Sequence, residues 1–232
     1  MPEMHSERVW ITGPRGRLSG ELAYGPGAPR CAALLLSPHP YMGGRMTLPL
    51  LTQLAEALAA RDIITLRFDY GGIGQSEGPP VQIGESMQRF WKTGAAPEDP
   101  ILLEEARAAL AWLNANAPGA TALVGYSFGS FLASQLCDAH TAAIAMIAPT
   151  IARHDYSTFN NQPTPTLIVY GKGDFATTDD ELKAWIARLP GAAEVRKLAA
   201  GDHFFRGMEA EIAATTAEFV ERACRSMEAH AR

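Results

Sequence analysis

Apolar positions fall into two alternating patterns along the chain. Short runs that are apolar at nearly every position are typical of strands buried on both faces of a sheet, and they occupy residues 32–37, 63–68, 122–125, 142–148 and 166–170. Longer segments with apolar residues three or four positions apart, as in amphipathic helices, occupy residues 48–61, 101–116, 128–139, 179–189 and 208–227. A last strand is expected at 194–198. This alternation predicts an α/β fold with a mostly parallel, doubly wound sheet.

Two segments of the chain fall outside this alternation: an N-terminal pair of strands and an aperiodic stretch in the middle. Residues 9–12 and 18–24 flank the turn-rich sequence GPRGR and predict an opening antiparallel hairpin. The chain has no internal repeat and no long linker, so we expect a single domain over residues 1–232. The longest stretch without periodicity, 71–99, is rich in Gly and Pro and includes a short helix around Phe90 and Trp91. Loops of this length inside a compact domain are usually functional, for example as lids.

The strongest chemical signal is the pentapeptide Gly125-Tyr126-Ser127-Phe128-Gly129. It matches G-x-S-x-G and lies between a predicted strand and a predicted helix, the context that exposes a nucleophilic serine on a tight turn. The glycines avoid collisions at that turn, and the amino end of the helix adds free N–H groups beside the reacting oxygen. The alternative is a glycine-rich structural turn that happens to contain a serine. Ser127 is the predicted nucleophile.

On these residues the chain resembles the α/β-hydrolase family, from the opening hairpin to the terminal helix. The resemblance implies an α/β-hydrolase fold and a triad in the order serine, acid, histidine. Asp174 ends a glycine loop after the strand at 166–170, and His203 follows the strand at 194–198. His203 would accept the proton of Ser127, and Asp174 would orient the imidazole. Asp155 and Asp202 are alternative acids.

The turn after the first parallel strand, residues 37–44, resembles the family's oxyanion-hole turn. By position, the backbone N–H groups of Tyr41 and Phe128 would stabilise the oxyanion. Pro40 has no N–H, so Tyr41 offers the first amide after it. We expect His39 to shape the turn. The loop that begins at Asp69 resembles the family's D-x-x-G-x-G-x-S segment and is expected to be structural.

The predicted substrate pocket is shallow, because the 17 residues from 149 to 165 are too few for a large cap domain. Aromatic residues are expected to line it. They are Phe90, Trp91, Tyr126, Phe159 and Phe175. Phe90 and Trp91 have an equally good alternative interpretation as core residues at the sheet edge.

Composition and charge narrow the possible partners. Lys and Arg number 20 against 25 Asp and Glu, a formal net charge of −5 without a basic run, which argues against nucleic-acid binding. The sequence contains no apolar stretch long enough to cross a membrane and no secretory signal, so a cytoplasmic protein is expected. Cys31, Cys137 and Cys224 are far apart in sequence and are expected to be buried, reduced thiols. No cofactor or metal is expected.

These features predict a serine hydrolase of the carboxylesterase or thioesterase type, which cleaves a small-molecule acyl substrate through an acyl-Ser127 intermediate. Two alternatives remain open. The same triad would serve an acyltransferase or cyclase in a biosynthetic pathway, and the fold also occurs in proteins that only bind ligands. The sequence leaves the oligomeric state undecided.

Overall fold

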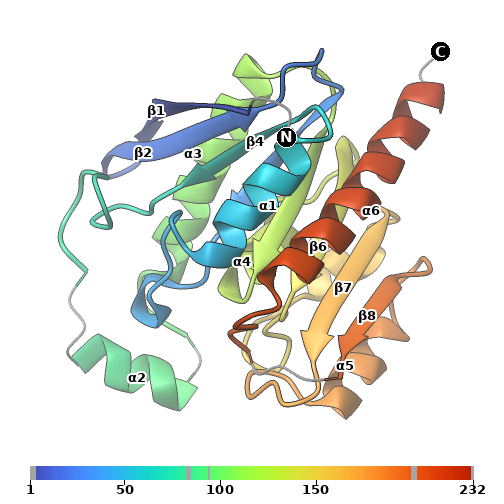
Figure 1. The fold of residues 1–232 in the computed structure, drawn as a ribbon. Coiled ribbons are helices and arrows are strands. Elements are labelled where there is room, and N and C mark those ends of the chain that lie inside the picture. The colour runs from blue at the N-terminus through green and yellow to red at the C-terminus, as the bar shows by residue number, and fades with distance from the viewer. Residues whose placement is uncertain (1–3, 82–84, 94, 200–202, 231–232) are drawn as a thin grey trace.

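A computed structural model describes residues 4–81, 85–93, 95–199 and 203–230 (Figure 1). Its centre is an eight-stranded sheet with the order β1-β2-β4-β3-β5-β6-β7-β8. The strands are β1 (His5–Gly13), β2 (Gly16–Tyr24), β3 (Cys31–Leu36), β4 (Ile63–Phe68), β5 (Thr121–Tyr126), β6 (Thr141–Ile147), β7 (Thr166–Gly171) and β8 (Glu194–Leu198). The β1–β2 hairpin and the β2–β4 pair are antiparallel, and all later pairs are parallel. The predicted α/β-hydrolase fold with an antiparallel N-terminal hairpin is confirmed.

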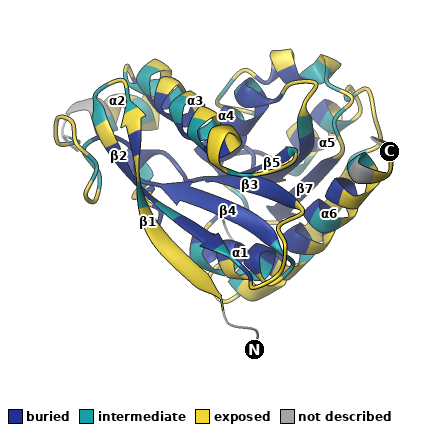
Figure 2. Cartoon of the chain, turned by 90° about the horizontal axis from the view of Figure 1, so that it is seen from above, coloured by how far each residue is buried: buried dark blue, intermediate teal, exposed yellow. Residues whose placement is uncertain are grey.

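Helices cover both faces of this sheet. They are α1 (Pro49–Ala59), α2 (Glu85–Thr93), α3 (Asp99–Asn116), α4 (Phe128–Leu136), α5 (Asp179–Ile186) and α6 (Glu209–His230), with short 3-10 turns η1 (Pro40–Met42) and η2 (Ser157–Asn161). Helices α1 and α6 pack on one face, and α3, α4 and α5 pack on the other, each over its own apolar cluster. Figure 2 shows the central strands as a buried layer between these helices, with β1 forming an exposed edge. Buried on both faces, the central strands have the continuous apolar runs seen in the sequence.

Helix α4 is shorter than the sequence pattern predicts. It ends at Leu136, where the expected helix continued to 139. Cys137 has an extended backbone conformation, and the Asp138 carboxylate accepts the N–H of His140, which forms a local turn. Asp side chains compete with helical hydrogen bonds in this way, so the helix stops one turn early.

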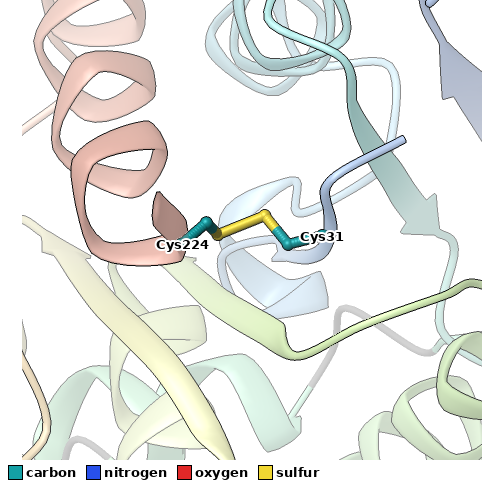
Figure 3. Close-up of a disulfide and its surroundings, with 2 residues drawn as sticks. All are labelled: Cys31 and Cys224. Carbon is teal, nitrogen blue, oxygen red and sulfur yellow. A yellow bond between two sulfur atoms is a disulfide. The ribbon is translucent and has the colours of Figure 1, made fainter. Parts of the chain in front are cut away.

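The prediction of three reduced thiols is wrong for two of them. Cys31 and Cys224 form a disulfide between the start of β3 and helix α6, with their Cα atoms 6.3 Å apart (Figure 3). Their separation of 193 positions in the sequence hid this proximity, which arises because α6 packs back over the sheet. Cys137 is free and buried. Two of the three cysteines therefore no longer support a reducing compartment, and a cytoplasmic location stays a prediction.

Parallel strands bring distant loops to one edge of the sheet. The carboxyl ends of β3, β5, β6, β7 and β8 lie at the same edge, and the segments that follow them contain the predicted chemistry. Within the described residues, none of the helices combines the length and the apolar character that a membrane span requires.

Candidate active site

Ser127 lies on a strained turn between β5 and α4. Its backbone has φ 56° and ψ −119°, a conformation that non-glycine residues rarely adopt, and its N–H donates to the Ile147 carbonyl at 2.8 Å. The flanking glycines allow the close approach of neighbouring backbone. A Cβ at Gly125 would lie 2.2 Å from the Gly129 carbonyl oxygen, and one at Gly129 would lie 2.1 Å from the Leu36 carbonyl oxygen. The pentapeptide pattern thus has a steric cause.

The structure brings the three predicted triad residues into one hydrogen-bonded chain. The Ser127 Oγ lies 2.7 Å from His203 Nε2, and His203 Nδ1 lies 2.9 Å from Asp174 Oδ1. The side chains of His203 and Asp174 are only 4% and 3% exposed. Asp174 Oδ1 also accepts the Ala176 N–H at 2.8 Å, which fixes the carboxylate. With Nδ1–H directed at the carboxylate, Nε2 can accept the serine proton.

The two alternative acids do not share this position. Asp155 is exposed, and its Oδ1 accepts the N–H of Ser157 at the start of η2. This hydrogen bond holds the pKa of the Asp155 carboxyl below its ordinary value. Asp155 therefore stabilises its own turn, whereas Asp174 contacts the imidazole. Asp202 lies outside the described residues.

The turn before α1 differs from the prediction at Tyr41. The Tyr41 N–H donates to Nδ1 of the buried His39 ring at 3.1 Å, so that amide already has an acceptor inside the turn. The N–H groups of Met42 and Gly44 both donate to the His39 carbonyl, at 2.8 and 3.1 Å. The prediction that the Tyr41 N–H binds the oxyanion is therefore wrong in this structure, because the neighbouring His39 imidazole accepts that N–H.

One amide of this turn remains available. Between Pro38 and Gly44, all of which the structure describes, His39 is the residue whose N–H has no acceptor. Pro38 and His39 line cavities that also reach Ser127. The Phe128 N–H lies at the amino end of α4, where helix geometry leaves the first amides without intrahelical acceptors.

Two cavities meet at the serine. The larger, about 200 Å³, is mostly apolar. Its walls are Pro38, Met42, Leu48, Pro49, Leu50, Tyr126, Ser127, His203, Phe204, Arg206 and Glu209. The smaller, about 60 Å³, shares Met42, Ser127 and His203 with the larger one and is rich in aromatic rings. The apolar residues at 42 and 48–50 were missed by the sequence reasoning, because helical spacing marks Leu50 only as a core position.

The predicted substrate-binding residues separate into three groups. Phe90, Trp91 and Phe175 line the smaller cavity, and Trp91 and Phe175 are 54% and 49% exposed at its mouth. Tyr126 lines the larger cavity, and its hydroxyl donates to the His203 carbonyl at 2.8 Å. The prediction that Phe159 lines the substrate pocket is wrong. Its side chain is 1% exposed and packs in the core beside Trp185, because η2 turns the ring inward.

The loop after β4 is structural, as its sequence suggests. Asp69 Oδ1 accepts the Met46 N–H at 2.7 Å, and the Ser76 hydroxyl accepts the Ser19 N–H at 2.9 Å. Burial raises the pKa of the Asp69 carboxyl, and the Met46 hydrogen bond opposes that rise. In the part of the chain that the structure describes, no three His, Cys, Asp or Glu residues are arranged to hold a metal ion.

Comparison with known proteins places this geometry in a family. A family model described as "Alpha/beta hydrolase domain" matches residues 32–232. An uncharacterized protein of Rickettsia prowazekii is 29% identical over 214 residues, which cover 86% of this chain and 82% of that protein.

Solved structures agree. A protein of unknown function from Agrobacterium tumefaciens, described as a putative alpha/beta hydrolase, has a TM-score of 0.79 at 26% identity, with 95% of this chain and 97% of that chain covered. An alpha-beta serine hydrolase homologue from Coxiella burnetii has a TM-score of 0.73 at 25% identity, with 93% and 96% covered. The fold also matches a serine hydrolase without lid from Xanthomonas campestris, with a TM-score of 0.77 at 22% identity and 94% of both chains covered. The protein is an alpha/beta hydrolase, and the chain belongs to the alpha/beta hydrolase domain family.

Proposed function

We propose that the protein is a serine esterase that cleaves a small-molecule acyl ester through an acyl-Ser127 intermediate. The observation that carries the proposal is the buried hydrogen-bonded chain from Ser127 through His203 to Asp174. A serine hydroxyl is a weak nucleophile, and a base placed 2.7 Å away removes that limitation. The family membership supports the hydrolase class but leaves the substrate to be inferred from the cavities.

In the first step, Ser127 Oγ bonds to the acyl carbon while its proton passes to His203 Nε2. The buried Asp174 carboxylate stabilises the imidazolium that forms. Collapse of the tetrahedral intermediate breaks the bond to the leaving alcohol, which takes the proton from His203. Water then repeats the sequence on the acyl-enzyme, giving the carboxylic acid and free serine. The N–H groups of Phe128 and His39 would stabilise the oxyanion in both steps.

The larger cavity is the best candidate for the acyl group, because its wall is mainly apolar and it borders Ser127 directly. Its volume of about 200 Å³ falls below the roughly 300–1,000 Å³ that is typical of drug-sized sites. We therefore expect short acyl groups to react fastest. Thioesters would use the same groups and remain the alternative substrate within this mechanism.

Hydrolysis is favoured over acyl transfer by the exposure of the site. Trp91 and Phe175 are about half exposed at its mouth, and the segment between β6 and β7 contains only the short turn η2. Acyl transfer requires the exclusion of water from the acyl-enzyme, which closed active sites provide. A site without a large cap gives water direct access.

The test is the reaction of wild-type protein and Ser127→Ala with a fluorophosphonate probe and with p-nitrophenyl acetate, butyrate, octanoate and laurate. Wild type is expected to be labelled and to prefer the shorter esters, whereas Ser127→Ala should lose both labelling and turnover with little change in melting temperature. Ser157→Ala, at an exposed serine of η2, is the matched control and should behave as wild type. Parental turnover by Ser127→Ala would show that the nucleophile is misassigned.

A further inference from the structure

A second cluster of imidazole and carboxylate groups lies behind the smaller cavity. His39 Nε2 is 3.2 Å from Asp99 Oδ1, and His154 Nε2 is 4.0 Å from Asp99 Oδ2. The three side chains are buried, with 1%, 15% and 6% exposure for His39, Asp99 and His154. None of them belongs to the Ser127 triad. Among the described residues, none of the facing atoms His39 Nε2, Asp99 Oδ1 and His154 Nε2 has a hydrogen-bond partner. Buried polar atoms without partners are costly, and their presence beside an active site suggests a function.

Three separate parts of the chain form this cluster. His39 lies in the turn after β3, Asp99 is the first residue of α3, and His154 follows β6. The amino end of α3 favours a carboxylate at Asp99, whose Oδ2 also accepts the Ala96 N–H at 3.1 Å. His154 Nδ1 lies 2.9 Å from the Thr150 hydroxyl. The Ala96 N–H thus holds the Asp99 carboxylate, and the Thr150 hydroxyl holds the His154 ring beside it.

The other charged groups near the His39 ring are Glu98 and Arg15, which line a cavity on its far side. Arg15 is paired with the buried Glu105 at 2.9 Å. Of the described acidic residues, Asp99 is the one with a carboxylate oxygen within 4 Å of a His39 ring nitrogen. The contact at Nε2 is therefore specific to Asp99.

His39 organises the turn that approaches the serine. Its Nδ1 accepts the Tyr41 N–H, and its carbonyl accepts two further N–H groups of the same turn. Its ring packs against Phe90 of α2 at 4.8 Å and against Phe128 at 4.9 Å between centroids, next to the nucleophile. Because Nδ1 accepts the Tyr41 N–H, the neutral tautomer of this ring carries its proton on Nε2. Asp99 Oδ1 lies 3.2 Å from that nitrogen, close to it but outside hydrogen-bond geometry in this structure.

We propose that Asp99 is a positioning residue for the oxyanion hole: its carboxylate fixes the orientation and tautomer of the His39 ring, and the ring fixes the turn that directs the His39 N–H toward the oxyanion. This inference rests on the proposed function. It parallels the role of Asp174 toward His203, because a carboxylate selects which ring nitrogen carries the proton. Its effect belongs to the transition state, since the oxyanion is absent from the bound ester.

The first test is Asp99→Asn, which preserves shape and removes the charge. Removal of one oxyanion donor costs roughly 10²–10³-fold in kcat, and a misplacement of about 1 Å costs up to about 10²-fold. We therefore expect kcat to fall by about 10- to 100-fold with KM within about twofold, and the affinity for a boronic acid transition-state analogue to fall in parallel. Glu98→Gln, one residue away, is the matched control and should retain wild-type kcat and analogue affinity.

A double-mutant cycle separates an effect through His39 from a general effect on folding. His39→Asn retains an oxygen acceptor for the Tyr41 N–H, but its shorter side chain has no atom at the position of Nε2, where the ring approaches Asp99. If Asp99 acts through the ring, adding Asp99→Asn to His39→Asn should cause no further loss of kcat. A further tenfold loss would overturn the proposal. Should Asp99→Asn fail to fold, His39→Asn alone should still lower kcat and analogue affinity together, and unchanged values would overturn the proposal.

A structural readout needs no turnover. Long-range ¹H–¹⁵N spectra should show the His39 proton on Nε2 in wild type and a mixture of tautomers in Asp99→Asn; a wild-type proton on Nδ1 overturns the proposal. Failure of the two proposals can be told apart. A wild-type protein that neither reacts with fluorophosphonate nor hydrolyses esters refutes the proposed function. A labelled, active wild type with an equally active Asp99→Asn variant refutes the role of Asp99.

Discussion

Replacement of Asp174 by Asn tests which acid serves His203. In the structure a single oxygen, Asp174 Oδ1, lies 2.9 Å from His203 Nδ1 and accepts the Ala176 N–H at 2.8 Å. An Asn side chain can place its own Oδ1 at this position, held by the same Ala176 amide. The substitution therefore preserves shape and one anchoring hydrogen bond, and removes the negative charge beside the imidazole.

The expected loss follows from the burial of the pair. Because both side chains are less than 5% exposed, solvent screens the carboxylate–imidazolium interaction only weakly. Replacement of a triad Asp by Asn typically lowers kcat by about 10⁴-fold. With the Ala176 anchor retained, we expect a loss of about 10³- to 10⁴-fold in kcat/KM for Asp174→Asn, which corresponds to about 4 to 5.5 kcal/mol of transition-state stabilisation.

The assay is p-nitrophenyl butyrate hydrolysis by purified wild type, Asp174→Asn and Asp155→Asn, with thermal unfolding as the control for folding. Asp155 is exposed and caps its own turn, so its variant should stay within about twofold of wild type. If folded Asp174→Asn retains more than about a tenth of wild-type kcat/KM, or if Asp155→Asn loses as much as Asp174→Asn, the assignment of the acid is refuted.

Two further predictions concern stability. Cys224→Ser should lower the free energy of unfolding by about 2–5 kcal/mol, because the disulfide to Cys31 links residues 193 positions apart. The variant should keep its kcat, since the disulfide lies at the opposite end of β3 from the active site. Denaturant unfolding and ester turnover measure the two effects, and an unchanged unfolding midpoint would contradict the expectation. Burial lowers the pKa of His154 against the opposing effect of Asp99, so below the ordinary histidine pKa the unfolded chain binds a proton that the folded chain does not. The free energy of unfolding should therefore fall as the pH is lowered from about 7 to 5, and His154 should contribute at most about 1.4 kcal/mol per pH unit to this fall. Denaturant titrations of His154→Gln should show a smaller fall. Identical pH dependence in the two proteins would refute the assignment of the effect to His154.

Local pattern was enough to predict the elements and the position of the nucleophile. The alternation of buried strands and amphipathic helices depends on neighbours within a few residues, which is why the predicted segments match the observed strands and helices closely. The elbow is partly local. A Cβ at Gly125 would lie 2.2 Å from the Gly129 carbonyl oxygen of the same turn, whereas a Cβ at Gly129 would lie 2.1 Å from the Leu36 carbonyl oxygen of the neighbouring strand β3. The spacing of the two glycines around Ser127 is nevertheless visible in the sequence.

Contacts between distant segments were not predictable in the same way. The sequence left three candidate acids, and only the fold placed the Asp174 carboxylate on the His203 ring. It also left Asp99 without any distinguishing signal, because its importance depends on α3 beginning beside the turn after β3. Side-chain orientation within a segment was equally hidden, as Phe159 turns into the core while Phe175 remains half exposed.

The sequence alone determined that this chain forms a parallel α/β sheet with a serine on a tight strand-to-helix turn, since both depend on periodicity and steric limits over short stretches. The tertiary structure decided which acid meets the histidine and that Cys31 lies against Cys224. Those outcomes depend on how helices pack across the sheet, where residues separated by tens to hundreds of positions come within a few ångströms of each other.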